Sequence, residues 1–170
     1  NHPERLIPIR NGDEFRAPDG QRLDLHWNLF HECCGPGASE DIWDAAVNCD
    51  LEGADVFTPG FADLLLHVIV HGARWSPAQP LAWTSDAIVL IRAAKESVDW
   101  DRLLEQTRRR RLVAPVPGAL RYLRVRCGTS IPVRVVEELS RAKVTFTERL
   151  EHIVKVSPRP LVGTLPVLWF

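Results

Sequence analysis

Apolar and polar residues alternate without interruption in the stretch Arg22-Leu23-Asp24-Leu25-His26-Trp27-Asn28-Leu29. Successive side chains of a β-strand point to opposite faces, so this alternation predicts a strand with one apolar and one polar face. The apolar face holds Leu23, Leu25, Trp27 and Leu29. We therefore expect a half-buried strand whose polar face presents an acid, an imidazole and an amide.

Further β-structure is predicted on both sides of this strand. Upstream, the short apolar run at residues 6–9 is followed by the turn signal Asn11-Gly12-Asp13, and Ala17-Pro18-Asp19-Gly20 forms a second turn. Downstream, residues 49–56 are consistent with another hairpin or strand. Between them, Ser39-Glu40-Asp41 is expected to cap a short helix that reaches Val47.

The remainder of the chain reads as helices. Thr58 is a plausible N-cap with Pro59 at the first position of a helix that extends to about Trp75. Asp99 is expected to cap a later helix, and Gly128 to end another. The helices are predicted at residues 58–75, 81–95, 99–112, 117–126, 132–142 and 147–156. Strands followed by helices favour an α+β fold: short antiparallel strands at the N-terminus, then a mainly helical bundle.

Three segments are expected from this pattern. Residues 1–56 hold the strands and a short helix, residues 57–156 form a helical subdomain, and residues 157–170 form a proline-punctuated, apolar tail. The chain contains no methionine, even at position 1. We therefore expect it to be a processed or truncated piece of a longer protein.

Bulk composition excludes several classes of protein. With 45% hydrophobic and 25% charged residues, the 170-residue chain is not predicted to be disordered. A formal net charge of −1 disfavours long nucleic acids as partners, and the apolar runs are too short to span a membrane. The four cysteines show no zinc-binding spacing, and the adjacent Cys33 and Cys34 favour free thiols in the cytoplasm.

Asp24 and His26 are the first candidates for chemistry. Both point to one face of the predicted strand, about 7 Å apart along it. A carboxylate beside an open site suits Mg²⁺, which prefers oxygen ligands, and such a carboxylate can orient an attacking hydroxyl. The alternative is that they form the solvated outer face of an amphipathic strand.

A polar stripe crosses the otherwise apolar helix that begins near Phe61. It consists of Asp63, His67, His71 and Arg74, spaced so that all lie on one face. Two histidines four residues apart can hold a metal, although buried histidines more often make hydrogen bonds. Asp86 lies among apolar residues of the next helix, so we expect it to be buried and paired with His71 or Arg74.

Two further charged motifs have simpler explanations. Asp99 and Asp101 could bind a metal, but they stand at a helix start, where capping accounts for them. The four arginines from Arg108 to Arg111 point all round a helix, so a solvated helix end is favoured over a phosphate or nucleic-acid contact.

The order of several short motifs resembles a bacterial family of uncharacterised nucleotidyltransferases within the polymerase-β-type superfamily. The resemblance covers roughly residues 6–142. It begins in the strand with Leu23-Asp24-Leu25-His26-Trp27-Asn28-Leu29. It continues through Trp43-Asp44-Ala45-Ala46, Thr58-Pro59, Leu64-Leu65-Leu66-His67, His71-Gly72-Ala73-Arg74, Leu81-Ala82-Trp83, Asp86, Asp99-Trp100 and Leu103-Leu104.

The resemblance implies a magnesium-dependent transfer of a nucleoside monophosphate from a nucleoside triphosphate to a hydroxyl acceptor. In that superfamily a Gly-Ser loop and an Asp-x-Asp strand precede a third metal-site acid, and Asp24 matches the third acid. Residues 1–56 then correspond to a remnant of the nucleotidyltransferase sheet. Neither Gly-Ser nor Asp-x-Asp occurs ahead of Asp24. The resemblance thus implies the C-terminal part of an enzyme, inactive by itself.

Within this interpretation, Asp24 is the catalytic and metal-binding acid and His26 an auxiliary contact. His67, His71, Arg74 and Asp86 form a substrate-side or supporting polar network. One alternative is a non-catalytic helical binding module derived from the fold. A weaker one is a metal-dependent phosphohydrolase that uses His67, His71 and Asp86 and retains a transition metal. A missing N-terminal half would expose its former contact surface around Leu23, Leu25 and Trp27, and homo-oligomerisation through that surface is a hypothesis that follows from this.

Overall fold

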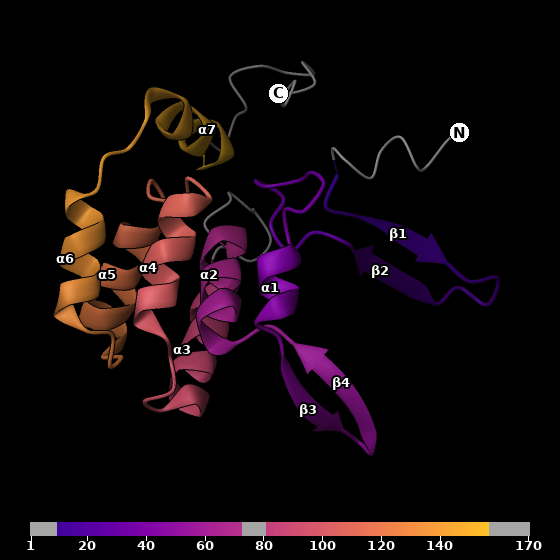
Figure 1. The fold of residues 1–170 in the computed structure, drawn as a ribbon. Coiled ribbons are helices and arrows are strands. Elements are labelled where there is room, and N and C mark those ends of the chain that lie inside the picture. The colour runs from indigo at the N-terminus through magenta and orange to yellow at the C-terminus, as the bar shows by residue number, and fades with distance from the viewer. Residues whose placement is uncertain (1–9, 73–80, 157–170) are drawn as a thin grey trace. The chain divides into compact units, whose positions relative to one another are not determined.

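The computed structural model describes residues 10–72 and 81–156, which fall into two compact units, residues 10–58 and 59–156. The first unit contains two antiparallel hairpins and a short helix, and the second contains helices (Figure 1). This composition confirms the predicted α+β class. The apolar run at residues 6–9 and the tail at 157–170 lie outside the described residues.

The first hairpin joins β1 (Gly12–Arg16) to β2 (Arg22–His26). Its register places Gly12 opposite His26 and Glu14 opposite Asp24. The predicted turn at residues 17–20 is confirmed: Gly20 adopts a φ of 89°, and its amide donates to the Ala17 carbonyl at 3.0 Å. The turn predicted at residues 11–13 is wrong, because Gly12 and Asp13 lie within β1.

The predicted burial of one face of β2 is also wrong. Every residue of β2 is exposed, and Leu23 and Leu25 retain 60% and 48% of their accessible surface. A hairpin of two strands lacks the additional strands or covering layer that bury an apolar face. The strand also ends at His26, so Trp27, Asn28 and Leu29 do not extend it.

The second hairpin, expected from the sequence at residues 49–56, consists of β3 (Val47–Leu51) and β4 (Ala54–Thr58). Glu52 and Gly53 form its two-residue loop with φ values of 53° and 87°. Positive φ at both loop residues matches the right-handed twist of the strands. The segment before this hairpin contains the predicted short helix as α1 (Glu40–Asp44). Its predicted end at Val47 is wrong, because Val47 begins β3.

Ser39 occupies the N-cap position of α1, as expected, but its side chain does not cap the helix. Its hydroxyl instead donates to Asn28 Oδ1 at 3.3 Å and accepts from the Leu29 amide at 3.3 Å. Ser39 thereby ties the start of α1 to the segment that follows β2. The predicted cap is replaced by a longer-range contact.

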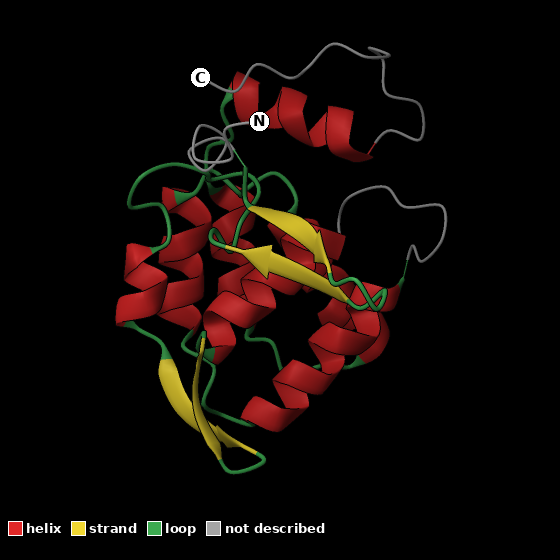
Figure 2. Ribbon diagram, turned by 90° about the vertical axis from the view of Figure 1, so that its right-hand side faces the viewer, coloured by secondary structure: helices red, strands yellow, loops and turns green. Residues whose placement is uncertain are grey.

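The second unit contains six helices among its described residues, at the places where the sequence predicts helices (Figure 2). They are α2 (Phe61–Gly72), α3 (Ala82–Ala94), α4 (Trp100–Arg109), α5 (Val116–Cys127), α6 (Val133–Arg141) and α7 (Phe146–Val156). Asp99 caps α4, since its carboxylate accepts the Arg102 amide at 2.9 Å. Thr58, in contrast, ends β4 rather than capping α2.

The core of this unit forms where α2 packs against α3, α4 and α5. Its fully buried side chains are apolar and come from helix faces with the expected spacing. They include Leu65, Leu66, Ile69, Leu103, Leu120, Leu123, Val135 and Leu139. Burial of these side chains is the main source of stability in the helical unit.

Two local features fix the position of α2. Asp63, which is fully buried, receives both Nε and Nη2 of Arg102 from α4 on its Oδ2, each at 2.8 Å. At the other end, a Cβ added to Gly72 would stand 2.0 Å from the Cβ of Trp83. Glycine at this position therefore allows α2 and the start of α3 to approach closely.

Candidate functional site

The polar face of β2 brings together Asp24 and His26, as the sequence predicts. Asp24 Oδ2 lies 3.0 Å from Nε2 of His26. The Asp24 side chain is 71% exposed and that of His26 is 38% exposed. The carboxylate is therefore held by a neighbouring imidazole and stays accessible to a ligand from solvent.

Asn11 orients His26 from the other side of the ring. The amide nitrogen Nδ2 of Asn11 lies 3.1 Å from Nδ1 of His26. An amide NH₂ group only donates, so this contact makes Nδ1 the acceptor and places the ring proton on Nε2. The same tautomer lets Nε2 donate to Asp24, which gives a continuous chain of contacts from Asn11 to the carboxylate.

Gly12 provides the space in which the imidazole sits. A Cβ at this position would lie 2.6 Å from the Leu25 carbonyl oxygen and 2.8 Å from Cδ2 of His26. Both distances are shorter than van der Waals contact, so any larger residue would displace the ring or the strand. Gly12 was interpreted from the sequence as a turn residue, and its role becomes visible only from its pairing with His26.

A second carboxylate, Glu14, stands directly opposite Asp24 in the hairpin. Its Oε1 accepts from Nε of Arg16 at 3.0 Å, and its Oε2 lies 3.6 Å from Nη1 of Arg22. These arginines offset the charge that Glu14 would otherwise place beside Asp24. The sequence analysis missed Glu14, since only a known register shows which residue faces Asp24.

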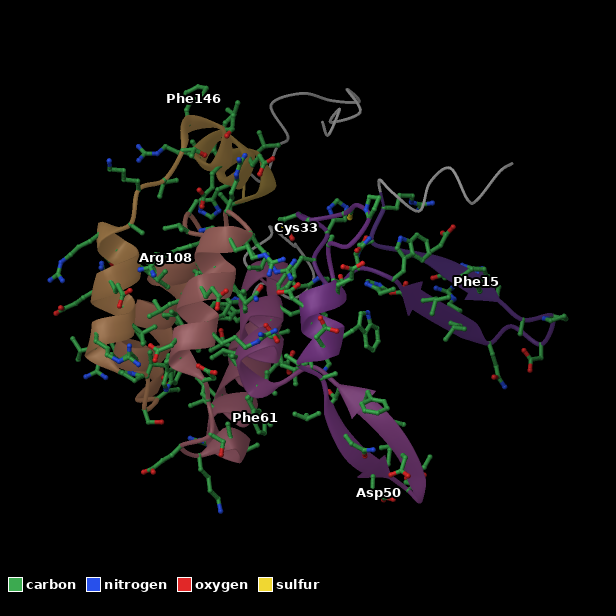
Figure 3. All side chains as sticks on the ribbon, in the orientation of Figure 1. Phe15, Cys33, Asp50, Phe61, Arg108 and Phe146 are labelled. Carbon is green, nitrogen blue, oxygen red and sulfur yellow. The ribbon has the colours of Figure 1, made fainter. Side chains whose placement is uncertain are left out.

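The opposite face of the hairpin is apolar and exposed. Phe15, labelled in Figure 3, retains 50% of its surface, and Leu23 is its partner in the register. Leu23 and Leu25 are exposed on this face, whereas Trp27 is half-buried. Homo-oligomerisation through this face stays a prediction.

A shallow pocket lies within the same unit, beside the end of the hairpin. Its volume is about 360 Å³, and it is lined by Trp27, Asn28, Trp43 and the segment of residues 35–40. Trp27 follows His26 directly in the chain, and its indole Nε1 donates to the Arg10 carbonyl at 2.7 Å. The pocket therefore combines the apolar surface of Trp27 and Trp43 with the side-chain amide of Asn28. Trp27 and Asn28 directly follow His26 in the sequence.

The described residues do not complete a metal site around Asp24. Across residues 10–72 and 81–156, no group of three or more histidine, cysteine, aspartate or glutamate side chains has an arrangement that could hold a metal ion. Mg²⁺ takes near-octahedral oxygen coordination and is usually bound by carboxylates together with substrate phosphates. Asp24 alone does not fit as a full Mg²⁺ site, so we derive no step through a metal from these residues.

A family model matches a stretch of the chain that includes the whole of this site. Residues 4–128 match the family described as uncharacterised nucleotidyltransferase, which is more than half of the chain. The chain belongs to this nucleotidyltransferase family. No curated protein and no solved structure matches the chain.

Membership of the nucleotidyltransferase family supports a function of nucleotidyltransferase type, with a nucleoside triphosphate as substrate. The matched residues include both hairpins and the helices α1 to α5. In the part of this family member that the structure describes, no helix is long and apolar enough to cross a membrane.

The second predicted cluster of the nucleotidyltransferase chain forms only in part. The rings of His67 and His71 stack on α2 with their centroids 5.6 Å apart. Asp86 lies on α3 but is exposed, and no hydrogen bond or ion pair joins it to a described residue. The expectation that Asp86 is buried is therefore wrong, because its position faces solvent and not the α2–α3 interface. Arg74 lies outside the described residues.

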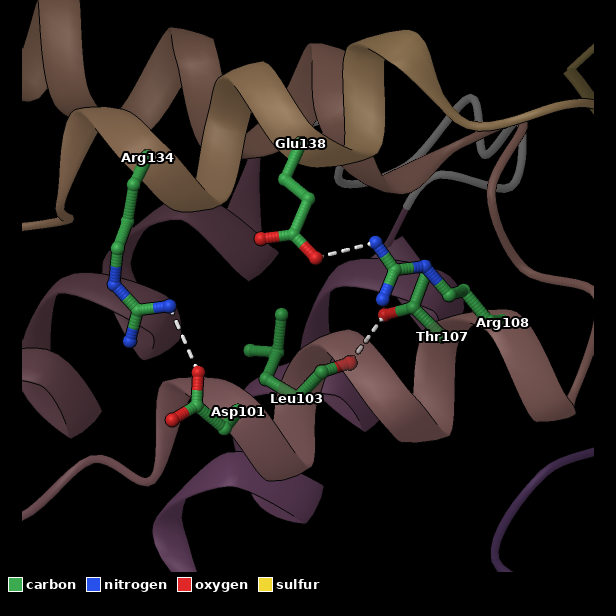
Figure 4. A network of polar contacts seen from close by, with 6 residues as sticks. All are labelled: Asp101, Leu103, Thr107, Arg108, Arg134 and Glu138. Atoms are coloured by element: carbon green, nitrogen blue, oxygen red, sulfur yellow. Dashed lines mark hydrogen bonds and ion pairs between the residues drawn. The ribbon is translucent and has the colours of Figure 1, made fainter.

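The remaining charged motifs mostly have structural partners. Asp101 pairs with Arg134 of α6 at 2.8 Å, and Arg108 pairs with Glu138 of α6 at 2.6 Å (Figure 4). Arg110 is only 7% exposed and donates to Gln106 Oε1 at 2.8 Å. The arginine run is thus not a uniformly solvated helix end, because one of its members is buried. All four cysteines are free thiols.

Proposed function

We propose that this chain is the C-terminal portion of a nucleotidyltransferase that transfers a nucleoside monophosphate from a nucleoside triphosphate to a hydroxyl acceptor. Membership of the family supports the class of reaction. The observation that carries the assignment of residues is the accessible Asp24 carboxylate, held 3.0 Å from His26 on a strand face. We assign Asp24 as the acid that orients and deprotonates the acceptor.

In the proposed reaction the acceptor oxygen forms a bond to the α-phosphorus of the triphosphate. The bond from that phosphorus to the bridging oxygen breaks, and pyrophosphate leaves with the electron pair. The proton of the hydroxyl passes to Asp24. A carboxylate at hydrogen-bond distance from the hydroxyl provides general base catalysis of this kind.

His26 acts as a positioning residue in this proposal. Its Nε2 donates to Asp24 and its Nδ1 accepts from Asn11, so the carboxylate is held on one side and open on the other. Gly12 contributes indirectly, because it leaves room for the imidazole. The stacked pair of His67 and His71 stays a candidate for a supporting role.

Mg²⁺ would supply charge stabilisation on the phosphates when it is bound, as in other nucleotidyl transfers. Among the described residues, no group of three or more potential metal ligands includes Asp24, and the sequence has no Gly-Ser followed by Asp-x-Asp ahead of it. We therefore propose that the missing acids belong to an upstream part of the gene product and that the 170-residue chain is inactive alone.

The test compares this chain with the whole gene product. Each is incubated with Mg²⁺ and α-³²P-labelled nucleoside triphosphates, and label transfer to protein, nucleic acid and small-molecule acceptors is measured. We expect transfer by the whole product and none by the 170-residue chain. Absence of Gly-Ser and Asp-x-Asp codons upstream, or absence of transfer by the whole product, would contradict the proposal.

A non-catalytic binding module is the second candidate, and the exposed apolar face of the first hairpin favours it. Phe15, Leu23 and Leu25 present adjacent apolar surface, which commonly marks an interaction site. In that case the whole product would bind a partner through this face and would show no transfer. The phosphohydrolase alternative is not supported, because the exposed Asp86 has no contact with His67 or His71 as a third ligand.

A further inference from the structure

The helical unit contains a second pocket that the proposed reaction does not use. It has a volume of about 500 Å³ and lies where the ends of α4 and α6 meet the start of α7. Six charged side chains line it, four of them cationic: Arg108, Arg111, Arg141 and Lys143, with Glu138 and Glu148. Its lining therefore carries an excess of positive charge in a chain whose net charge is −1.

Two of these cations are already neutralised by neighbours. Arg108 pairs with Glu138 at 2.6 Å, between α4 and α6, as Figure 4 shows. Arg141 pairs with Glu137 at 3.2 Å along α6. Each also lies in the last turn of its helix, where a cation complements the helix dipole. These pairs explain Arg108 and Arg141 without a ligand.

Arg111 and Lys143 have no such explanation. Both are exposed, both lie beyond the ends of their helices, and the side chain of neither makes an ion pair or hydrogen bond with a described residue. Two cations without anionic partners in one concave site repel each other. A bound anion would convert this repulsion into attraction.

Arg111 lies in the turn that ends α4. Its φ is 55°, in the left-handed region that residues with a Cβ seldom adopt. Lys95 ends α3 with a similar φ of 51°, and helices commonly end on one residue of positive φ. Glycine would fit this turn without the strain, so Arg111→Gly removes the guanidinium without a cost in backbone conformation.

The start of α7 provides a further contribution. Thr145 lines the pocket and caps the helix, since its hydroxyl accepts the Glu148 amide at 3.2 Å. The N-terminus of an 11-residue helix carries partial positive charge from its amides. Glu148 is 6% exposed and accepts the Ala114 amide at 2.8 Å, so this carboxylate is engaged by backbone at the pocket wall.

From these observations we propose that the pocket binds the phosphate chain of a small polyphosphorylated ligand through Arg111 and Lys143. Guanidinium and ammonium groups are the common protein ligands of phosphate oxygens. The pocket belongs to the helical unit and Asp24 to the other unit, and the proposal does not depend on the transfer reaction. Most of its lining residues lie outside the match to the family model, which ends at Gly128.

The test is a calorimetric titration of the 170-residue chain with inorganic triphosphate at low ionic strength. We expect saturable binding of one ligand. The double variant Arg111→Gln, Lys143→Gln should bind about tenfold more weakly, since exposed charge pairs contribute up to about 1 kcal/mol each. The control Arg126→Gln, an exposed arginine of α5 outside the pocket, should bind as the unaltered chain does.

Two variants separate ligand binding from a structural role. Arg111→Gly removes the guanidinium and the backbone strain together, so the affinity should fall while the melting temperature does not. Glu138→Gln releases Arg108 from its ion pair, so the affinity should rise about threefold. A structural role for these residues predicts lower melting temperatures and no gain of affinity.

The source of the phosphate chain is found by comparing inorganic triphosphate with a nucleoside triphosphate. Equal affinities would assign the phosphate chain alone as the ligand, and tighter binding of the nucleotide would assign a nucleotide. Absence of saturable binding, equal loss of affinity in Arg126→Gln, or stronger competition by a single-stranded oligonucleotide would overturn the proposal. Asp24→Asn should leave the binding unchanged, so failure here is distinguishable from failure of the transferase proposal.

Discussion

The two units of this protein bury very different amounts of apolar surface. In the described part of the chain, the buried apolar side chains of the first unit are Phe30 and Ile42, and all the others belong to the helical unit. In the first unit, strand β2 is instead exposed on both of its faces, including the polar face that carries Asp24 and His26. Stability is therefore concentrated in the helices, whereas the proposed catalytic acid, Asp24, lies on a hairpin that buries little apolar surface.

The largest expected effect comes from the buried ion pair between α2 and α4. Arg102→Met would leave the fully buried Asp63 carboxylate without its guanidinium partner. Removal of one partner of a buried ion pair costs about 3–5 kcal/mol, so we expect a loss of this size in the free energy of unfolding. Urea denaturation followed by circular dichroism measures it. Arg126→Met, on an exposed position of α5, is the control and should change little.

A leucine truncation compares the two units directly. Leu120 is fully buried in the helical unit, and Leu23 of the hairpin is 60% exposed. Leu120→Ala should cost about 2–5 kcal/mol, because it removes transfer free energy and leaves a cavity. Leu23→Ala should stay within about 0.5 kcal/mol. Similar losses for the two variants would show that the hairpin packs against something that the structure does not contain.

A glycine substitution tests the approach of α2 to α3. Gly72→Ala would place a methyl carbon 2.0 Å from the Cβ of Trp83. Overpacking of this kind costs about 1–3 kcal/mol. Thermal denaturation measures the effect, and Gly118→Ala is the control, because nothing lies within 4 Å of a Cβ at that position. An unchanged melting temperature for Gly72→Ala would contradict the close packing.

A smaller difference in the free energy of unfolding is expected between alanine variants of the two acids at the start of α4. Asp99 accepts the Arg102 amide at 2.9 Å, whereas Asp101 makes an exposed ion pair with Arg134. Asp99→Ala should cost about 1 kcal/mol through loss of the cap. Asp101→Ala should cost less, because exposed ion pairs contribute little. Equal losses measured by urea denaturation would argue against the capping interpretation.

The contrast between the hairpin unit and the helical unit also shows which features could be predicted from the sequence. Helix positions followed from apolar spacing and from caps such as Asp99, because these signals are local. The burial of β2 could not be predicted, since alternation gives the two faces of a strand but not whether anything covers them. Asn11, Gly12 and Glu14 were missed at the site for a related reason. Their roles depend on which residue of β2 each one faces, and register is not local information.

The sequence also did not predict correctly which charged side chains are buried. Asp86 was expected to be buried and is exposed, while Arg110 was expected to be solvated and is buried. Asp86 is followed by apolar residues in the chain, whereas Arg110 is flanked by Arg109 and Arg111. Only the packing of α3 and α4 determines which of their faces turns inward, and this packing arises from contacts distant in sequence.

The most direct test of the central claim measures activity and stability on the same variant of the whole gene product. Asp24→Asn is compared with Asp55→Asn, which changes an exposed acid of the second hairpin. We predict that Asp24→Asn lowers the rate of nucleotidyl transfer about a hundredfold or more and leaves the melting temperature unchanged. Asp55→Asn should change neither quantity. An Asp24→Asn variant that retains its rate, or that loses rate and stability together, would contradict the account.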